Sequence, residues 1–412
     1  MEKQKEIMIC SFCELPQSEV KILIKGISGA ICNNCTLQAL QLMETELNVP
    51  KIKSKKVKNK SNTSKPVEIH KFLDQYVIAQ EKAKKIIAVA VYNHYKRLRN
   101  ITEDSGVELE KSNIIIVGRT GTGKTLLAKT IAKLLNVPFA IVDATVFTES
   151  GYVGEDVESI ISRLLQVSNY DVALAERGII YIDELDKIAR KSDNPSITRD
   201  VSGEGVQQGL LKLLEGTELL VPPYGGRKHP EQKMIKINTQ NILFICGGAF
   251  DGIEPLIAKR VNRAIIGFKR NDENINISDE LLQYVSSADL KSYGLIPELI
   301  GRLPIVTHLE ALDFAALKLI LTEPKNALLK QYTQLFVMEN VELVIEPEVI
   351  DIIAENAINL GLGARGLRTI CEAIFTDIMY ILPSEHQQKF ILTKQYSEEK
   401  IKQANLSLLK AA

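Results

Sequence analysis

Residues 112–125 restrict the fold of this chain more than any other segment, because they join a buried strand to a helix through a glycine-rich loop. Four β-favouring apolar residues, Ile114 to Val117, precede the spacing G-x-x-x-x-G-K-T, which is typical of a phosphate-binding loop. Backbone amides of such a loop surround an anion, and the N-terminus of the next helix favours the same charge. The alternative is a chance glycine turn. The loop consists of Gly118, Arg119, Thr120, Gly121, Thr122, Gly123, Lys124, Thr125 and Leu126.

A second apolar strand, residues 177–182, ends in Asp183 and Glu184. We expect this strand to lie beside the first, where Asp183 and Thr125 would hold Mg²⁺ and Lys124 would reach the outer phosphates. Glu184 would polarise the water that attacks the γ-phosphate. The alternative is a strand that ends in solvated acids. Together the two motifs indicate an ATPase or GTPase.

The composition excludes several classes of protein. Lysine plus arginine equals aspartate plus glutamate at 51 each, so no global field favours nucleic acid or an anionic membrane. No apolar run approaches the roughly 20 residues of a transmembrane helix, and the first residues lack the apolar core of a signal peptide. We therefore expect a cytoplasmic protein with no membrane partner.

Four cysteines near the N-terminus follow the spacing C-x2-C-x18-C-x2-C. Two such pairs can place four thiolates around one Zn²⁺, and a segment of about forty residues needs a metal of this kind in order to fold. Two disulfides are the alternative, which the absence of a secretion signal disfavours. We interpret the module as a structural docking or dimerisation domain. Its ligands would be Cys10, Cys13, Cys32 and Cys35.

The segment from 51 to 65 contains seven lysines and no acid, so it predicts a flexible tether. Contact with nucleic acid is the weaker interpretation, since no aromatic residue is interleaved for base stacking. Beyond it, alternating strands and helices imply an α/β fold with a parallel sheet covered on both faces. We divide the chain into a zinc-binding domain over 1–50, a linker over 51–65, a large α/β ATPase domain over 66–311 and a small, mostly helical lid domain over 312–412.

Several segments have two interpretations from their residues alone. Val77 and Ile78 supply either an apolar slot for adenine or part of the core. Tyr152 and Val153, between two glycines, form either a mobile presenting loop or a simple turn. Residues 266–268, Ile-Gly-Phe, either anchor their own loop or dock into a partner.

The order of these motifs, from Cys10 to about Ile381, resembles the ClpX family of AAA+ protein unfoldases. The resemblance implies an AAA+ phosphate-loop fold with a helical C-terminal lid and a treble-clef-like zinc domain. It further implies a homohexamer that uses ATP, Mg²⁺ and Zn²⁺, takes tagged or unfolded proteins and adaptors as partners, and serves the ClpP peptidase. A nucleic-acid partner is disfavoured separately by the zero net charge and the few aromatic residues.

The resemblance also assigns roles to individual residues. Arg302 would reach the neighbouring subunit's nucleotide, and Arg365 would sense the γ-phosphate from the lid. Two positions depart from the family pattern: Arg119 replaces a more usual proline, and residues 269–271 differ from the usual small residues. The other implied contacts are Val77 and Ile78 with adenine, Tyr152, Val153, Arg227, Lys228 and His229 with substrate in the channel, and Ile266, Gly267 and Phe268 with the peptidase.

Overall fold

The chain forms two compact units, Met1–Asn62 and Thr63–Ala412, in a computed structural model. In the smaller unit, β1 (Leu23–Lys25) and β2 (Ala30–Cys32) form an antiparallel hairpin, and Ile9 pairs with Pro16 in an isolated bridge. The described residues are 9–36 without 18, 21, 27 and 28, then 38–39, 64–99, 109–147, 156–189, 203–222, 234–263, 281–361, 363–384 and 388–404.

The larger unit is built on a five-stranded sheet in which every pairing is parallel, as the sequence predicted. The strand order places β8 (Leu243–Gly248) between β3 (Ile114–Val117) and β5 (Ile179–Asp183), so our expectation that the acid-tipped strand lies beside the first strand was wrong. Parallel crossovers are long enough to skip a position, and sequence order does not fix which strands become neighbours. In spatial order the strands are β4 (Phe139–Asp143), β5 (Ile179–Asp183), β8 (Leu243–Gly248), β3 (Ile114–Val117) and β9 (Ile305–His308).

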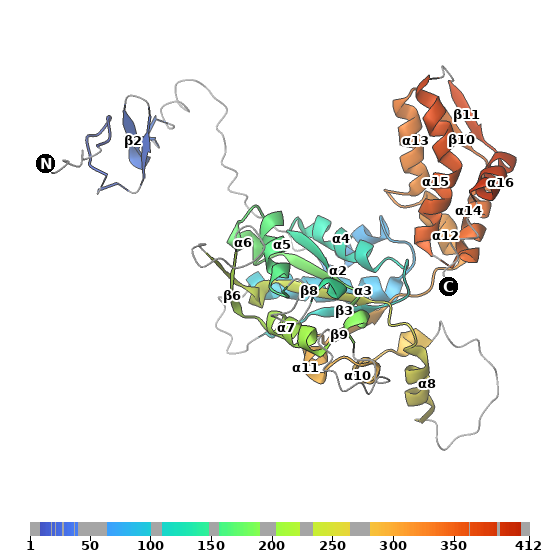
Figure 1. Cartoon of the computed structure of the whole chain (residues 1–412), viewed down its shortest axis with the longest axis horizontal. Helices are drawn as coiled ribbons and strands as arrows, with labels where there is room; N and C mark the ends of the chain where they lie inside the picture. The colour runs from blue at the N-terminus through green and yellow to red at the C-terminus, as the bar shows by residue number, and fades with distance from the viewer. Residues whose placement is uncertain are drawn as a thin grey trace. The chain divides into compact units, whose positions relative to one another are not determined.

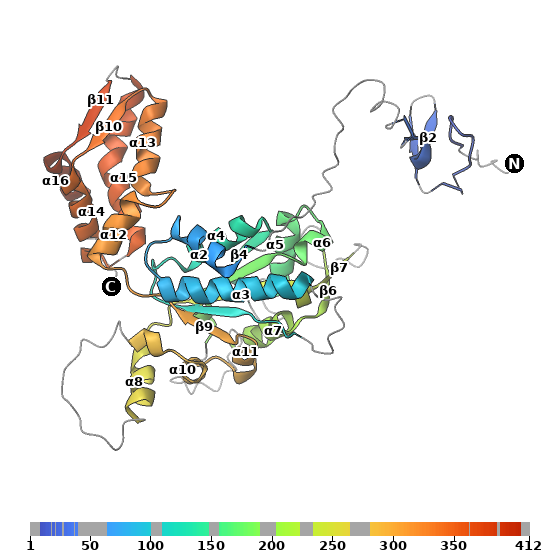
Figure 2. The same cartoon turned by 180° about the vertical axis from the view of Figure 1, so that it is seen from behind.

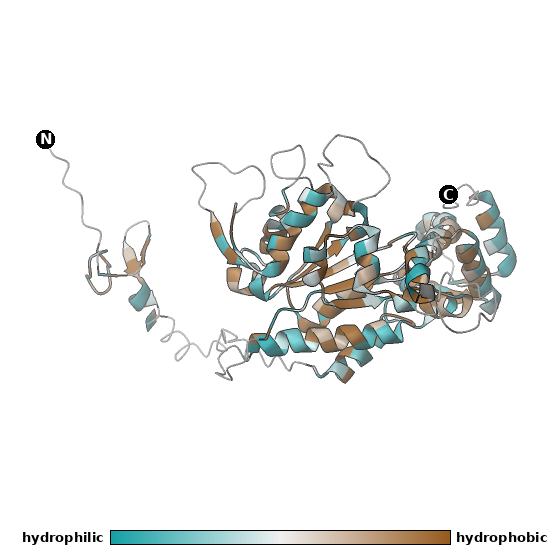
Figure 3. Cartoon of the chain, turned by 90° about the horizontal axis from the view of Figure 1, so that it is seen from below, coloured by the Kyte–Doolittle hydropathy of each residue, from teal (hydrophilic) through white to brown (hydrophobic). Residues whose placement is uncertain are grey.

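Both faces of the sheet are buried, which explains why its central strands are continuously apolar. Along β3, Ile114 and Ile116 join one core, while Ile115 and Val117 join the other. Figure 2 shows the long helix α3 (Glu81–Arg99) lying across one face of the sheet, and Figure 3 shows the strands as mainly hydrophobic. The first layer contains α2 (Pro66–Asp74), α3 (Glu81–Arg99) and α4 (Lys124–Leu135), and the second contains α5 (Ser159–Val167), α7 (Glu204–Glu215), α10 (Ser287–Tyr293) and α11 (Pro297–Gly301).

The lid has its own apolar core. Two short strands, Glu342–Ile345 and Lys389–Leu392, form a parallel pair within this mostly helical domain. Figure 1 shows this pair beside the lid helices. The elements are α12 (Phe314–Thr322), α13 (Leu328–Met338), β10 (Glu342–Ile345), α14 (Pro347–Asn359), α15 (Ala364–Ile381), β11 (Lys389–Leu392) and α16 (Lys394–Gln403).

Some elements were not predicted from the sequence. The antiparallel hairpin of β6 (Glu218–Val221) and β7 (Ile235–Asn238), which flanks Arg227 to His229 in the sequence, was not predicted, and neither was edge strand β9. No helix among the described residues is long and apolar enough to cross a membrane. The remaining short elements are η1 (Ala144–Val146), α6 (Val172–Ala175), η2 (Leu185–Ile188), η3 (Thr239–Asn241), α8 (Glu254–Arg263), η4 (Leu282–Tyr284) and η5 (Leu382–Ser384).

The close packing of β8 against β5 yields a stability prediction. A methyl group at Gly247 would overlap the Tyr181 hydroxyl and lie 2.8 Å from its Cζ atom, and Tyr181 is fully buried. We expect Gly247→Ala to destabilise the large domain by about 2 kcal/mol, which is typical of overpacking. The control is Gly301→Ala, whose added methyl meets no atom within 4 Å. Urea unfolding followed by circular dichroism measures both, and equal stability of the two variants would contradict the prediction.

Candidate functional site

The predicted phosphate loop lies between β3 and α4, and two of its three glycines have backbone conformations that side chains disfavour. Gly121 and Gly123 have φ of 84° and 104°, and α4 begins directly afterwards at Lys124. The Gly118 amide donates to the Gly248 carbonyl at 3.1 Å, which fixes the start of the loop to β8. The loop and the exposed amides at the start of α4 therefore provide the geometry of an anion site.

Lys124 is folded into this loop and is only 8% exposed. Its Nζ atom donates to the carbonyl of Gly118 and, at 3.0 Å, to that of Arg119. Burial lowers the pKa of Lys124, while the negative charges of Asp183 and Asp186 oppose the shift. Because the ammonium already lies buried in the loop, it can exchange its carbonyl partners for phosphate oxygens without first moving in from bulk water.

The acidic strand β5 brings Asp183 to the start of α4. The Thr125 hydroxyl donates to Asp183 Oδ2 at 3.0 Å, and the other oxygen, Oδ1, accepts from the Tyr181 hydroxyl at 3.2 Å. A hydroxyl and a carboxylate, the hard oxygen ligands that Mg²⁺ prefers, therefore lie in contact beside the phosphate loop. The two residues predicted to hold the metal are brought together across the intervening β8.

Glu184 directly follows β5 in a left-handed conformation, with φ of 56°. Its amide donates to Asp183 Oδ1 at 3.0 Å, and the residue is exposed. A left-handed non-glycine residue costs on the order of 1 kcal/mol, and such strain concentrates at functional sites. The conformation turns the chain sharply directly after Asp183, at the carboxyl end of β5.

Sequence reasoning did not single out Asp186, which is 4% exposed and near the same edge. Its Oδ1 accepts from the Ala249 amide at 3.0 Å, so it joins the turn after β5 to the end of β8. The signal was present in the sequence as a third acid of the run D-E-L-D, residues 183–186. Recognising it required knowing that β8 is the neighbour of β5.

The segment predicted to contact adenine is the turn between α2 and α3. Val77 is buried, Ile78 is half-buried, and the next residues, Ala79 and Gln80, have φ of 55° and 65°. Val77 belongs to the apolar core that α2, α3 and α4 form with the sheet. Part of the segment is therefore core, which is one of the two interpretations of the sequence. The half-buried Ile78 leaves apolar surface for a ring to contact.

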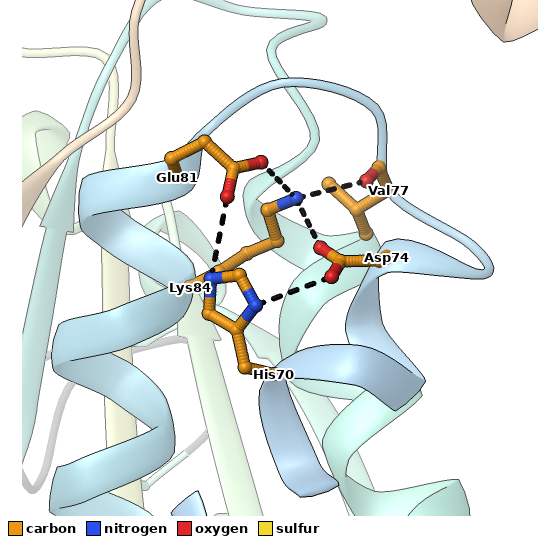
Figure 4. A network of polar contacts seen from close by, with 5 residues as sticks. All are labelled: His70, Asp74, Val77, Glu81 and Lys84. Atoms are coloured by element: carbon orange, nitrogen blue, oxygen red, sulfur yellow. Dashed lines mark hydrogen bonds and ion pairs between the residues drawn. The ribbon is translucent and has the colours of Figure 1, made fainter. Parts of the chain in front are cut away.

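A charged network ties the two ends of this turn together (Figure 4). Lys84 is 2% exposed, and its Nζ lies 2.5 Å from Asp74 Oδ1 and 2.6 Å from Glu81 Oε1. The same atom lies 3.5 Å from the Val77 carbonyl. His70 bridges the outer sides of both acids, with Nδ1 3.2 Å from Asp74 and Nε2 3.4 Å from Glu81. The ammonium of Lys84 occupies the centre of this acidic pair, so the cluster is a structural clamp on the turn.

The two predicted arginines lie in different environments. Arg302 follows α11 and is 51% exposed, with its Nη2 3.0 Å from Glu215 Oε1 at the end of α7. Arg365 is exposed in the first turn of α15, and its charge lowers the pKa of Lys124 as a smaller contribution after burial and the two acids. The preceding Ala364 amide donates to the Gly121 carbonyl at 3.4 Å. The lid helix α15 therefore begins against the phosphate loop, and Arg302 is held elsewhere by its own ion pair.

The four N-terminal cysteines come together as the spacing predicted, with all Sγ atoms within 4.8 Å of one another. Thiolates bound to zinc at about 2.3 Å in a tetrahedron lie about 3.8 Å apart, so the group fits one Zn²⁺. Burial opposes ionisation of Cys10, but backbone amides, including that of Cys32 at 3.2 Å, lower its pKa to about 6. Four thiolates fill a tetrahedral shell and leave no place for a substrate, so this centre is structural.

Three groups of predicted residues lie outside the described part of the chain. They are the channel pair Tyr152 and Val153, the basic loop Arg227 to His229, and the docking tripeptide Ile266 to Phe268. Their roles stay predictions.

The fold and the site define an AAA+ ATPase: a phosphate loop on a parallel sheet, an acid-tipped strand beside its lysine, and a helical lid against the loop. Three family models match in this order along the chain. They are the ClpX C4-type zinc finger over residues 8–45, the AAA domain (Cdc48 subfamily) over 109–306 and the C-terminal, D2-small domain, of ClpB protein over 312–391.

Relatives with curated descriptions identify the family. The chain is 58% identical to the ATP-dependent Clp protease ATP-binding subunit ClpX of Bacteroides fragilis, over 407 residues and 98% of each chain. It is 57% identical to that of Bacteroides thetaiotaomicron over the same share, and 51% identical to that of Borrelia duttonii over 95% of this chain and 91% of the relative. The chain therefore belongs to the ClpX family, which confirms the resemblance. It is an ATP-binding AAA+ protein with a C4 zinc finger.

The clamp around the adenine turn yields a second prediction. Lys84→Met would leave Asp74 and Glu81 without their shared cation. Because these acids are 43% and 69% exposed, water compensates part of the loss, and we expect destabilisation of about 1–2 kcal/mol together with weaker ADP binding. The control is Lys85→Met, the same change at an exposed neighbour. Thermal unfolding and ADP titration measure both variants, and identical behaviour would show that the network does not hold the turn.

Proposed function

We propose that this chain is an ATP-dependent protein unfoldase and translocase that threads tagged proteins into the ClpP peptidase and also acts alone as a chaperone. The observation that carries the proposal is the contact between Thr125 and Asp183 beside the buried Lys124, because it assembles the parts needed for triphosphate hydrolysis. The ClpX relatives are described as ATP-binding subunits of the ATP-dependent Clp protease, which supports ClpP as the partner. A cytoplasmic location stays a prediction.

In the proposed hydrolysis, the phosphate-loop amides and Lys124 bind the phosphates. Thr125 and Asp183 hold Mg²⁺, which neutralises charge on the phosphate oxygens. Glu184 orients the attacking water and accepts its proton. The glutamate is suited to this role because the chain turn after β5 leaves it exposed, while Asp183 is tied to Thr125 and Tyr181.

We propose that the two arginines neutralise negative charge on the nucleotide from different subunits of a homohexamer. Arg302 would reach the neighbour's nucleotide, so hydrolysis would require ring assembly. Arg365 would contact the γ-phosphate of its own subunit, an assignment supported by the start of α15 against Gly121. Loss of that phosphate would release the lid, and the lid motion would drive the substrate-gripping loop.

Substrate handling is proposed for segments beyond the ATPase site. Tyr152 and Val153 would grip the polypeptide in the axial channel, with the basic loop Arg227 to His229 at its entrance. Ile266 to Phe268 would dock onto ClpP. The zinc domain would receive substrates and adaptor proteins, a role consistent with a metal centre that has no open coordination position.

Glu184→Gln tests the hydrolytic role. The variant keeps the size of the side chain but cannot accept a proton at neutral pH, so ATP should bind normally while turnover falls by at least about a hundredfold. Equilibrium binding and phosphate release measure the two effects separately. The control, Glu355→Gln, makes the same change at an exposed residue of α14 and should retain full turnover. Normal turnover by Glu184→Gln would remove this residue from the mechanism.

Tyr152→Ala tests the gripping role separately from hydrolysis. The variant should still hydrolyse ATP but unfold a tagged folded substrate at least about tenfold more slowly, because the aromatic side chain that pushes on the chain is gone. Tyr152→Phe retains the ring and should keep most of the activity. Unfolding by the alanine variant at the wild-type rate would refute the channel assignment.

A further inference from the structure

The side chain of Gln80 makes a paired contact with a backbone segment 230 residues away. Its Nε2 donates to the Glu310 carbonyl at 2.8 Å, and its Oε1 accepts from the Glu310 amide at 2.8 Å. Gln80 is 2% exposed, so water does not replace either bond readily. One amide side chain thereby fixes both polar groups of a single residue.

The location of Gln80 makes this pairing unusual. The residue directly precedes α3, where a short polar side chain commonly caps the helix, but its side chain bonds Glu310 instead. It also completes the strained turn, since both Ala79 and Gln80 have positive φ. The Lys84 clamp holds this turn to α2 and α3 (Figure 4), and Gln80 holds it to Glu310.

Glu310 lies where the chain leaves the sheet for the lid. The preceding residue, Leu309, is fully buried, and its amide donates to the Val117 carbonyl at 2.8 Å. A methyl group at Gly118 would lie 3.0 Å from Leu309 Cβ, so this segment packs directly against the phosphate loop. The first lid helix begins a few residues later at Phe314. We call residues 309–314, which connect the sheet to the lid, the hinge. The start of the hinge is therefore held between the phosphate loop and the adenine turn.

The same turn also contacts the lid itself. The Lys325 amide, between α12 and α13, donates to the Gln75 carbonyl at 2.9 Å. The turn thus has one bond to the lid through Gln75 and two to the hinge through Gln80.

We infer that Gln80 is a positioning residue that couples occupancy of the adenine site to the start of the lid hinge. The inference depends on the proposed contact of Val77 and Ile78 with adenine. When adenine orders the turn, the paired bonds of Gln80 transmit that order to Glu310, and the lid orientation follows. Without Gln80, nucleotide still binds to the phosphate loop but no longer orders the hinge.

Hydrogen–deuterium exchange of the full chain, with and without saturating Mg·ADP, tests this coupling. In the wild type, ADP should slow exchange in peptides that cover the phosphate loop, residues 118–127, and the hinge, residues 309–314. In Gln80→Met, the phosphate-loop response should persist while the hinge response is lost, and the Kd of ADP should rise about five- to tenfold with the loss of two hydrogen bonds. Gln166→Met, at an exposed position of α5, is the matched control and should behave as the wild type.

A second variant, Gln80→Glu, keeps the size of the side chain and can still accept from the Glu310 amide, but it cannot donate to the carbonyl. In this variant, ADP should slow hydrogen–deuterium exchange at the hinge less than it does in the wild type. A hinge response equal to that of the wild type in both variants would overturn the inference, even if both unfold at lower temperature, because that pattern describes a merely structural contact. A wild-type phosphate loop that ADP does not protect would instead overturn the proposed nucleotide site, and this inference with it.

Discussion

The hydrogen bond between Thr125 and Asp183 is the contact on which the rest of the site depends. It joins the first turn of α4 to the end of β5, although β8 lies between β5 and β3, the strand that precedes α4. This placement is possible because parallel strands all end at one edge, so residues on non-adjacent strands meet above the strand between them. Gly247 and Gly248 of β8 leave room for neighbouring side chains, since a methyl group at Gly247 would overlap Tyr181, which donates to Asp183, and one at Gly248 would overlap Phe250.

The nucleotide site is surrounded by backbone held in unfavourable conformations. Ala79, Gln80 and Glu184 all have positive φ, and each lies beside an interaction that fixes it. The Lys84 network and the Glu310 pair hold the first two, and the bond from the Glu184 amide to Asp183 accompanies the third. Strain of this kind persists only where surrounding contacts over-determine the chain, and here those contacts lie where phosphate and adenine would bind.

The two units of the chain are stabilised by different physical means. The large domain buries apolar residues on both faces of its sheet, and the lid has a separate core. The N-terminal unit leaves Ile9 and Phe12 at least half exposed and instead gathers four thiols around one point. A segment of this size buries too little apolar surface to fold on that basis alone, so metal binding supplies much of its folding free energy.

Sequence by itself determined the chemistry of this protein: the phosphate loop, the two acids after a buried strand, the zinc cysteines and the parallel α/β class. These features are local, because each is a short spacing whose residue types have few other uses. Tertiary structure decided which strands are neighbours, and so corrected the expected position of β5, and it revealed the contacts of Asp186 and Gln80. Those contacts join residues between 63 and 230 positions apart, and no local pattern encodes such pairings because they depend on how the crossovers place the strands.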